Sequence, residues 1–507
     1  MPPIAERAAK RPPARGPRDE GDPDISRALG FGEARMHLMQ TLHHGTTQGA
    51  TVVRFEGRID PQALETAVAQ ARRAYGILRV DIVERGKSLF FRRRAAGGPL
   101  PMTVVPRRSD THWIELLELE NSRPLDPSRG LWRLFLLQSD DGVRMKTSSP
   151  PRGEIVFLAH HGILDGAASA TLVQRILDDA VHPRAHWPRR PIPPATEAIC
   201  PSGQTWESFQ AKQATFLRNL AAVDPMPHAV VAPIAERTTR VIPLGFSGDT
   251  VAALARRSEA AGVTVYSLLS ALLLLAVKEH SPSRSHFTLH TAISLRSMCE
   301  RARALKADDL GCYLTVVGSV HEVGCQGAGA LAQEHRDAIY DAALRHGRTP
   351  AEVDLAALRS SIGAAGGARH FSQDLGITYL AVPEVEPIGD VRVVEHYISA
   401  SRAVGTAALI VHAIHRGSGL FVTVNYTAPL QRDAWAHAVA TTLARLVDES
   451  PVQAAELPAS SSRVGRPGHP SRPPTDPDVR LHASGSSDHG FAARAIAECT
   501  MRGVGSG

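Results

Sequence analysis

One strand–turn–helix unit constrains the fold of this chain more than any other feature. An apolar run at residues 154–159 is typical of a buried strand, and a periodic segment that begins at Gly166 and stops before Pro183 is typical of a helix. The turn between them, residues 160–165, reads His-His-Gly-Ile-Leu-Asp. A side chain just past a strand end faces a cleft while a rigid element holds it, so this unit predicts an α/β fold with chemistry at the turn.

Strands and helices alternate through the rest of the chain as well. Asp60 and Pro61 are a typical N-cap and first helical residue, and Arg85-Gly86 is typical of a hairpin turn. Further expected elements are strands at 49–57, 285–295, 407–416 and 419–427, and helices at 267–279 and 329–345. The pattern predicts two α/β domains, at 25–182 and 244–450, joined by a proline-rich crossover at 183–243.

Both ends of the chain lack an apolar face. Residues 1–24 hold charge and proline without the apolar core of a signal peptide, and residues 451–507 are rich in Ser, Gly, Pro and Arg. We expect a disordered leader and a disordered tail. The longest apolar stretch, 262–277, is shorter than the roughly 20 residues that cross a bilayer, so it is expected to be a buried helix and not a transmembrane segment.

Charge and cysteine content exclude several classes of protein. The formal net charge of +6 is small for 507 residues, and no basic stripe indicates a nucleic-acid partner. The one tight basic cluster, residues 92–94, is interpreted as a solvated hairpin tip, with a contact to phosphates or to an acidic partner as the alternative. The five cysteines are scattered and form no CxxC pair, which favours reduced thiols in the cytoplasm and no metal site.

The two histidines of the turn suit acid–base chemistry. A neutral imidazole has a pKa near 6.5, so it can accept a proton at physiological pH and return it later. One histidine suffices as a base. Asp165 can orient the turn through an ion pair or cap the following helix, and Gly166 lets the backbone turn without a clash. The alternative is that His160 and His161 are incidental turn residues and Asp165 is only a cap.

Taken with the segments around it, the turn carries a family resemblance. "HHGILDG" resembles the HHxxxDG signature of the chloramphenicol-acetyltransferase-like superfamily, which includes condensation domains, alcohol acetyltransferases and polyketide-associated acyltransferases. Segments similar to the family's other motifs follow in the family's order over about residues 27–449, namely "RALGFGEARMHL", "RGLWRLFLL", "GVTVYSLLSALLLLAV", "SLRSM", "LGCYLTVV" and "GSGLFVTVNYT". HHxxxDG is a specific marker in that order, whereas each other match is weak alone.

The resemblance implies two chloramphenicol-acetyltransferase-like α/β sandwich domains with a channel at their interface. It also implies acyl transfer from a thioester to a small-molecule alcohol or amine. His161 would be the catalytic base, His160 and Asp165 its structural supports, and Gly166 a residue that makes space. No cofactor would be bound; the co-substrate would be acyl-CoA or an acyl group on the phosphopantetheine of a carrier protein, which is then a possible partner.

Departures from the family pattern limit what is carried over. The family's late Ser-Asn-Leu-Gly stretch is Thr378-Tyr-Leu-Ala here, and the asparagine of its Asn-Leu-Arg segment is Ser294. Thr378 could donate a hydroxyl to the oxyanion, or it could be a plain strand residue. We expect a free-standing monomeric acyltransferase of secondary or lipid metabolism that forms esters rather than amides. The alternative is a catalytically silent relative that binds a carrier protein or a small ligand.

Three further expectations concern single residues. A buried carboxylate must be paired, and by the resemblance the partner of Asp165 is Arg296, at about 3 Å with two parallel hydrogen bonds. His43 and His44 lack a following Asp-Gly and are interpreted as surface or turn residues. Cys312 is interpreted as a core residue of a strand and not as a nucleophile.

Overall fold

A computed structural model describes residues 24–449, except 96, 140–150, 185, 200–203, 222, 297–304, 306–308, 347–348, 351, 365–366 and 385. The predicted tail, and the predicted leader apart from Asp24, therefore lie outside the described residues. So do three of the five cysteines, while Cys312 and Cys325 are free thiols.

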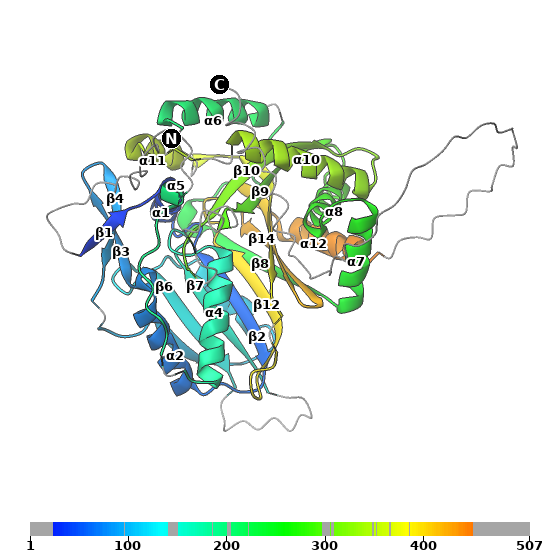
Figure 1. Ribbon diagram of the computed structural model, residues 1–507. Helices are drawn as coiled ribbons and strands as arrows, with labels where there is room; N and C mark the ends of the chain where they lie inside the picture. The colour runs from blue at the N-terminus through cyan, green and yellow to red at the C-terminus, as the bar shows by residue number, and fades with distance from the viewer. Residues whose placement is uncertain are drawn as a thin grey trace, which may run out of the picture.

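The described strands form three sheets (Figure 1). The five-stranded sheet has the order β12 (Arg392–Ala400), β2 (Gly49–Glu56), β7 (Arg152–Ala159), β6 (Trp132–Gln138), β5 (Met102–Pro106). The six-stranded sheet has the order β10 (Leu314–Glu322), β9 (His286–Ser294), β11 (Gln373–Val382), β13 (Ala407–Arg416), β14 (Gly419–Ala428), β8 (Thr238–Phe246). The small third sheet has the order β1 (Ile25–Ala28), β4 (Ser88–Arg93), β3 (Val80–Arg85).

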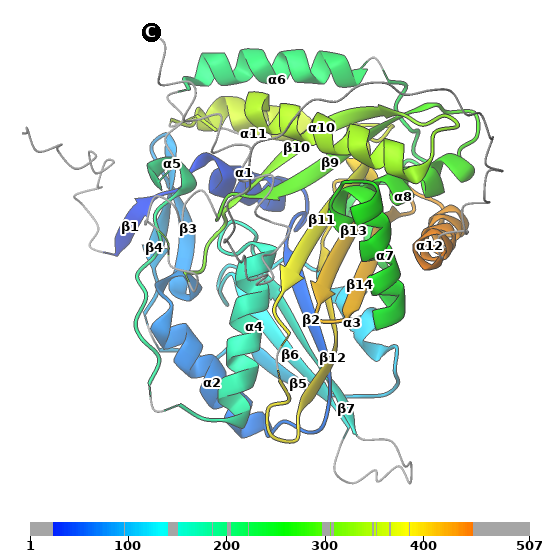
Figure 2. The ribbon, with the colours of Figure 1, turned by 45° about the vertical axis from the view of Figure 1, so that its right-hand side comes forward.

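Helices cover the two large sheets and make two lobes, as expected for the two-domain α/β fold (Figures 1 and 2). In the first lobe α2 (Pro61–Ala74) and α4 (Gly166–Val181) share a core with one face of the five-stranded sheet, and α3 (His112–Asn121) packs on the other. In the second lobe the core helices are α7 (Gly248–Ala260), α8 (Val265–Glu279) and α12 (Asp433–Asp448). The remaining helices are α1 (Phe31–Leu42), α5 (Thr196–Ile199), α6 (Trp206–Ala221), α10 (Ala328–His346) and α11 (Leu355–Ala364).

Local sequence signals explain where the helices begin. The Asp60 carboxylate accepts a hydrogen bond from the Gln62 amide at 3.1 Å, with Pro61 as the first helical residue of α2, as predicted. At α8 the Thr264 hydroxyl accepts from the Ser267 amide at 3.1 Å. The long apolar stretch is the buried helix α8, as expected. In the described part of the chain no single helix is long and apolar enough to cross a membrane; α7 and α8 satisfy that test only as a pair, which is bent by 98°.

One strand crosses between the lobes. β12 belongs by sequence to the predicted domain 244–450, yet it pairs with β2 of the first lobe along its length (Figure 1, yellow beside blue). Its neighbours in sequence, β11 and β13, pair with each other in the second lobe. The predicted crossover, 183–243, contains α5, α6 and the start of β8. The lobes therefore share backbone hydrogen bonds, and neither sheet is built from one predicted domain alone.

The six-stranded sheet turns one face toward the first lobe. Successive residues of a strand point to opposite faces, and on β11 Leu375 and Ile377 are fully buried in the core of the second lobe while Thr378 is half-buried. Leu380 lies on the same face as Thr378 and packs against Ile398 of β12. This face therefore lies at the junction between the lobes.

The β2–β12 contact yields a test of stability. Gly57 has φ +103°, and a Cβ there would lie 2.2 Å from the carbonyl oxygen of Asp390, just before β12. Gly86 also has a positive φ, +60°, but a Cβ there would meet open space. We expect Gly86→Ala to lower the free energy of unfolding by about 1 kcal/mol and Gly57→Ala to lower it by about 2–3 kcal/mol or more.

Denaturant unfolding of both variants measures the difference. Equal losses in the two would mean that the close approach of the chain before β12 to Gly57 does not contribute to stability.

Candidate active site

The histidine loop, defined as residues 160–165, connects β7 to α4 at the junction between the lobes. Ala159, the last residue of β7, pairs with Gly49 of β2, and the His160 amide still donates to the Leu131 carbonyl at 2.8 Å. The Ile163 amide donates to the His160 carbonyl at 2.9 Å, which closes a tight turn. The loop is therefore fixed at both ends by backbone hydrogen bonds, as the predicted strand–turn–helix unit requires.

His160 is locked in one neutral form. It is 2% exposed, and its Nδ1 accepts the Gly162 amide proton at 2.9 Å. The ring proton is therefore on Nε2, which lies 3.3 Å from Nδ1 of His37 on α1 and can donate to it. Burial lowers the pKa of His160 well below its ordinary value. With both nitrogens occupied, this ring holds the loop and is not available as a base.

His161 has the features of a base. Its side chain is half-buried, and burial lowers its pKa, while a hydrogen bond to its own backbone and the Asp165 carboxylate act in the opposite direction. The ring is therefore unprotonated at neutral pH. Nδ1 lies 3.9 Å from Sγ of Cys312, and within the described residues Nε2 has no hydrogen-bond partner. This nitrogen can take a proton from a bound molecule.

Asp165 and Arg296 form the contact that the sequence analysis predicts. The Arg296 guanidinium donates to the carboxylate through Nε at 3.2 Å and Nη2 at 3.0 Å, across the two lobes. The carboxylate, 4% exposed, also accepts the Ala168 amide at 2.7 Å, as the N-cap of α4, and the Tyr313 amide at 2.9 Å. Asp165 is thus an ion-pair partner and a helix cap at once.

Gly166 and Thr378 lie near this loop. A Cβ on Gly166 would lie 3.0 Å from Cδ1 of Leu380 of β11, so a larger residue would require this leucine side chain to shift. Thr378 pairs in register with His412 of β13, whose pKa is lowered to about 3 by burial and by the charges of Arg402 and His161. The Thr378 side chain therefore comes from the sheet face that lies across from the histidine loop, and its role toward an oxyanion stays a prediction.

Comparisons with known proteins identify the architecture. No family model matches the sequence, and no curated protein matches it. Solved structures do match. A mutant starter condensation domain of rhizomide synthetase in complex with C8-CoA and Leu-SNAC has a TM-score of 0.59 at 15% identity, over 84% of this chain and 95% of the domain.

Two other kinds of structure match over similar lengths. Polyketide synthase associated protein 5 from Mycobacterium tuberculosis has a TM-score of 0.56 at 15% identity, over 84% of this chain and 98% of its own. The X-domain from teicoplanin biosynthesis has a TM-score of 0.55 at 14% identity, over 83% of this chain and 94% of its own. The protein has the condensation-domain fold. The predicted fold class is confirmed, and the low identities carry no further conclusion.

Within the condensation-domain fold, the sequence interpretations of Cys312 and His43 hold in part. Cys312 is buried, and burial raises the pKa of its thiol well above the ordinary value, as expected for a core residue that is not a nucleophile. It lies just before β10 and not in a strand, and its Sγ lies 3.9 Å from Nδ1 of His161. His43 lies in a turn, as expected, but it is only 2% exposed and its Nε2 lies 2.7 Å from the Ile362 carbonyl oxygen, so it is not a surface residue. His44 is an exposed turn residue, as expected. Neither contact has a local sequence signal.

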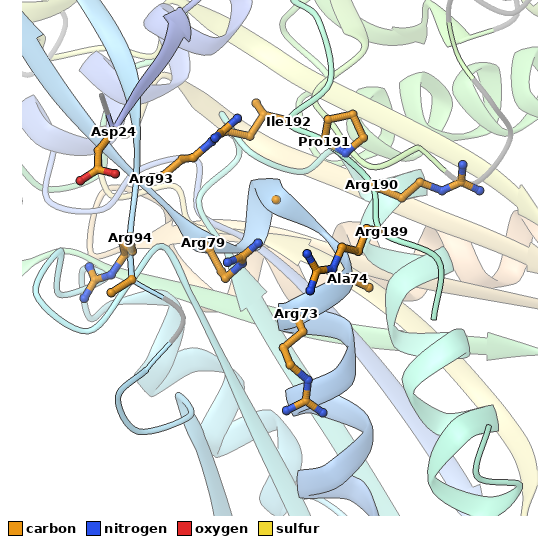
Figure 3. A pocket seen from close by; sticks show the side chains of 12 residues that line it. Asp24, Arg73, Ala74, Arg79, Arg93, Arg94, Arg189, Arg190, Pro191 and Ile192 are labelled. Atoms are coloured by element: carbon orange, nitrogen blue, oxygen red, sulfur yellow. The ribbon is translucent and has the colours of Figure 1, made fainter. Parts of the chain in front are cut away.

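The basic cluster 92–94 is not a hairpin tip either. The tip is at Gly86, and the cluster lies at the other end of β4, where Arg92 and Arg94 pair with Asp81 at 3.2 and 2.7 Å. Arg93 and Arg94 line a solvent-facing pocket of about 580 Å³ together with other arginines. Figure 3 shows these side chains, which are Arg73, Arg79, Arg93, Arg94, Arg189 and Arg190, with Asp24.

The geometry of Asp165 predicts the effect of its loss. Asp165→Ala removes the carboxylate and leaves the Arg296 guanidinium in a desolvated position, so we expect a loss of about 3–5 kcal/mol in the free energy of unfolding. Asp165→Asn keeps a cap acceptor, worth about 1 kcal/mol, and should recover only that part. Both variants should also misplace His161. Chemical denaturation measures the two losses; an Asp165→Asn protein as stable as the wild type would reduce Asp165 to a helix cap.

Proposed function

We propose that the protein is an acyltransferase that moves an acyl group from a thioester to a hydroxyl or amine, with His161 as general base. The observation that carries the proposal is the open Nε2 of a neutral histidine in a loop that is held by an interlobe ion pair. The starter condensation domain with the same fold has been solved with C8-CoA, an acyl thioester, which supports this class of donor.

The reaction follows from the free nitrogen. Nε2 of His161 takes the proton of the acceptor as its oxygen or nitrogen attacks the thioester carbonyl carbon. The C–S bond then breaks, and the departing thiolate takes the proton back from the imidazolium. Such a base contributes about 10²–10⁴ in rate, and holding the two substrates together contributes much of the rest. Thr378 is the candidate donor to the oxyanion. We favour ester over amide formation and an acyl-CoA or carrier-bound donor in the cytoplasm.

A binding role without catalysis is the second candidate. The X-domain from teicoplanin biosynthesis, a protein of the same fold, has been solved in complex with OxyB, so this fold can serve as a docking unit. A neutral histidine with a free nitrogen in a fixed loop favours catalysis over docking alone. Release of free thiol from acyl thioesters in water distinguishes the two functions. A working base catalyses slow hydrolysis of the thioester in the absence of an acceptor, whereas a docking unit does not.

Removing His161 should abolish transfer and leave the fold intact. We expect His161→Ala to lower kcat/KM by about 10²–10⁴-fold, with a change below about 1 kcal/mol in the free energy of unfolding, since a half-buried polar ring packs little. His437→Ala, on the exposed side of α12, is the control. Mass spectrometry of products from a panel of acyl-CoA and acyl-carrier donors measures the effect. Activity within a few-fold of wild type would remove His161 from the mechanism.

The pH dependence tests the state of the base. His161 acts when unprotonated, and its pKa lies below the ordinary value of about 6.5 because burial disfavours the imidazolium. Activity should therefore be constant through neutral pH and fall only as the pH drops below that value. A profile of kcat/KM against pH measures the acid limb. A midpoint above the ordinary histidine pKa would contradict the burial of this ring.

A further inference from the structure

Two arginines near the histidine loop have no acidic partner. Arg35 lies on α1 and Arg402 in the loop after β12, and both side chains are half-buried. Other arginines near the loop do have acidic partners: Arg27 pairs with Glu33 at 2.7 Å, and Arg296 pairs with Asp165 at 3.0 Å. For Arg35 and Arg402 the described part of the chain provides no ion pair and no side-chain hydrogen bond.

Backbone register places Arg402 beside His161. Ala400 of β12, Gly49 of β2 and Ala159 of β7 pair in one row across the sheet. β12 and β7 are both antiparallel to β2, so they run in the same direction and end at the same edge. Arg402 and His161 each follow that row by two residues. They therefore emerge from one sheet edge, with only β2 between their strands.

Arg35 lies on α1, two residues before His37. Its helix, α1, contacts the histidine loop through His37 and His160, whose ring nitrogens are 3.3 Å apart. The charge of Arg35 lowers the pKa of Arg402, which falls to about 10, chiefly through burial. Burial lowers the pKa of His290 of β9 to about 3, and the charges of Arg35 and Arg402 act in the same direction. Two cations thus lie within electrostatic reach of each other and of neutral histidines.

These two arginines need a counter-ion more than the larger arginine cluster of Figure 3 does. That cluster faces solvent and includes Asp24, and Arg94 is paired, so water and salt screen its charges. Arg402 is largely desolvated, so water screens its charge less. At an effective dielectric constant of about 20 instead of 80, each interaction of this charge is about four times stronger. Nε2 of His412, 8% exposed, also lacks a hydrogen-bond partner among the described residues. A buried polar atom without a partner is a place where water, an ion or a polar ligand can bind.

We propose that Arg35 and Arg402 bind an anionic group, such as a carboxylate, carried by one of the two substrates beside His161. This deepens the proposed function by naming a substrate class: a transfer in which the acyl chain or the acceptor is acidic. A carboxylate accepts paired hydrogen bonds from a guanidinium, and two guanidinium groups hold it in a fixed direction. The anion would anchor the substrate that carries it. If that substrate is the acceptor, Nε2 of His161 would lie within reach of the attacking hydroxyl or amine; if it is the acyl donor, Nε2 would lie near the thioester carbonyl.

Matched substrate pairs locate the charge. For the acyl chain, adipoyl-CoA is compared with hexanoyl-CoA by release of free thiol without acceptor. For the acceptor, 3-hydroxybutyrate is compared with 3-hydroxybutyramide, with hexanoyl-CoA as donor. In one of these two comparisons the wild type should react faster with the charged substrate than with its neutral counterpart. Arg402→Gln and Arg35→Gln should each lower that ratio of rates about 10- to 100-fold. Arg129→Gln removes the same charge from the exposed surface and should keep the preference.

A binding measurement separates this inference from the proposed function. Adipate should raise the melting temperature of the wild type more than adipamide does, and Arg402→Gln should abolish the difference. If no thioester is turned over but this difference is present, the acyltransferase proposal fails and the anion site stands. If the wild type prefers the anion in neither substrate arm nor in binding, or if the preference survives in both arginine variants, the anion site is overturned.

The stability of the unliganded protein distinguishes binding from a structural role. An arginine kept for the fold is paired, as Arg237 is: it donates to the carbonyls of Ala232 and Val404 at 2.9 and 2.7 Å. Arg237→Gln should therefore melt several degrees lower. Arg402→Gln removes an uncompensated charge and should melt at the same temperature or higher. A fall for Arg402→Gln as large as that for Arg237→Gln, with adipate binding unchanged, would make Arg402 structural and overturn the proposal.

Discussion

The buried carboxylate of Asp165 is the interaction on which the site depends. A carboxylate away from water is stable only when its lone pairs are used, and here the Arg296 guanidinium and the amides of Ala168 and Tyr313 use them. One of these donors belongs to α4 of the first lobe, and the others to the segments that flank β10 and β9 of the second. The carboxylate is therefore satisfied only when the two lobes are together. The same contacts bring Cys312 against His161, so the assembly of the lobes also sets the direction of the His161 ring.

Burial keeps the ionisable side chains of the site in their neutral forms. His160 and His161 have lowered pKa values, and the thiol of Cys312 has a raised one, all with desolvation as the main cause. A thiol without charge is a poor nucleophile, and an imidazole without charge is a usable base. A site with this arrangement favours proton abstraction from a bound acceptor over attack by the enzyme's own cysteine.

The sequence predicts the elements better than it predicts their partners. α2, α4 and α8 follow from apolar periodicity and from caps that lie within a few residues of each helix start. The lobe that β12 joins depends on pairing with β2, more than 330 residues away in the chain, as in the contact of Arg392 with Glu56. No local pattern encodes that choice. The Asp165–Arg296 pair was predictable because a family resemblance supplied it, whereas Cys312 resembles a core residue by every local criterion.

The crossing of β12 also explains why residues without a motif lie next to the base. Because β12 and β7 end at the same edge of one sheet, backbone hydrogen bonds hold Arg402 and His161 at a fixed spacing. The base is further held by Asp165, while the guanidinium of Arg402 is held by no side chain in the described residues. A substitution of Arg402 therefore removes no side-chain hydrogen bond of the histidine loop among the described residues. In this architecture the strand that joins the lobes brings a guanidinium without an acidic partner among the described residues next to the loop that the sequence marks.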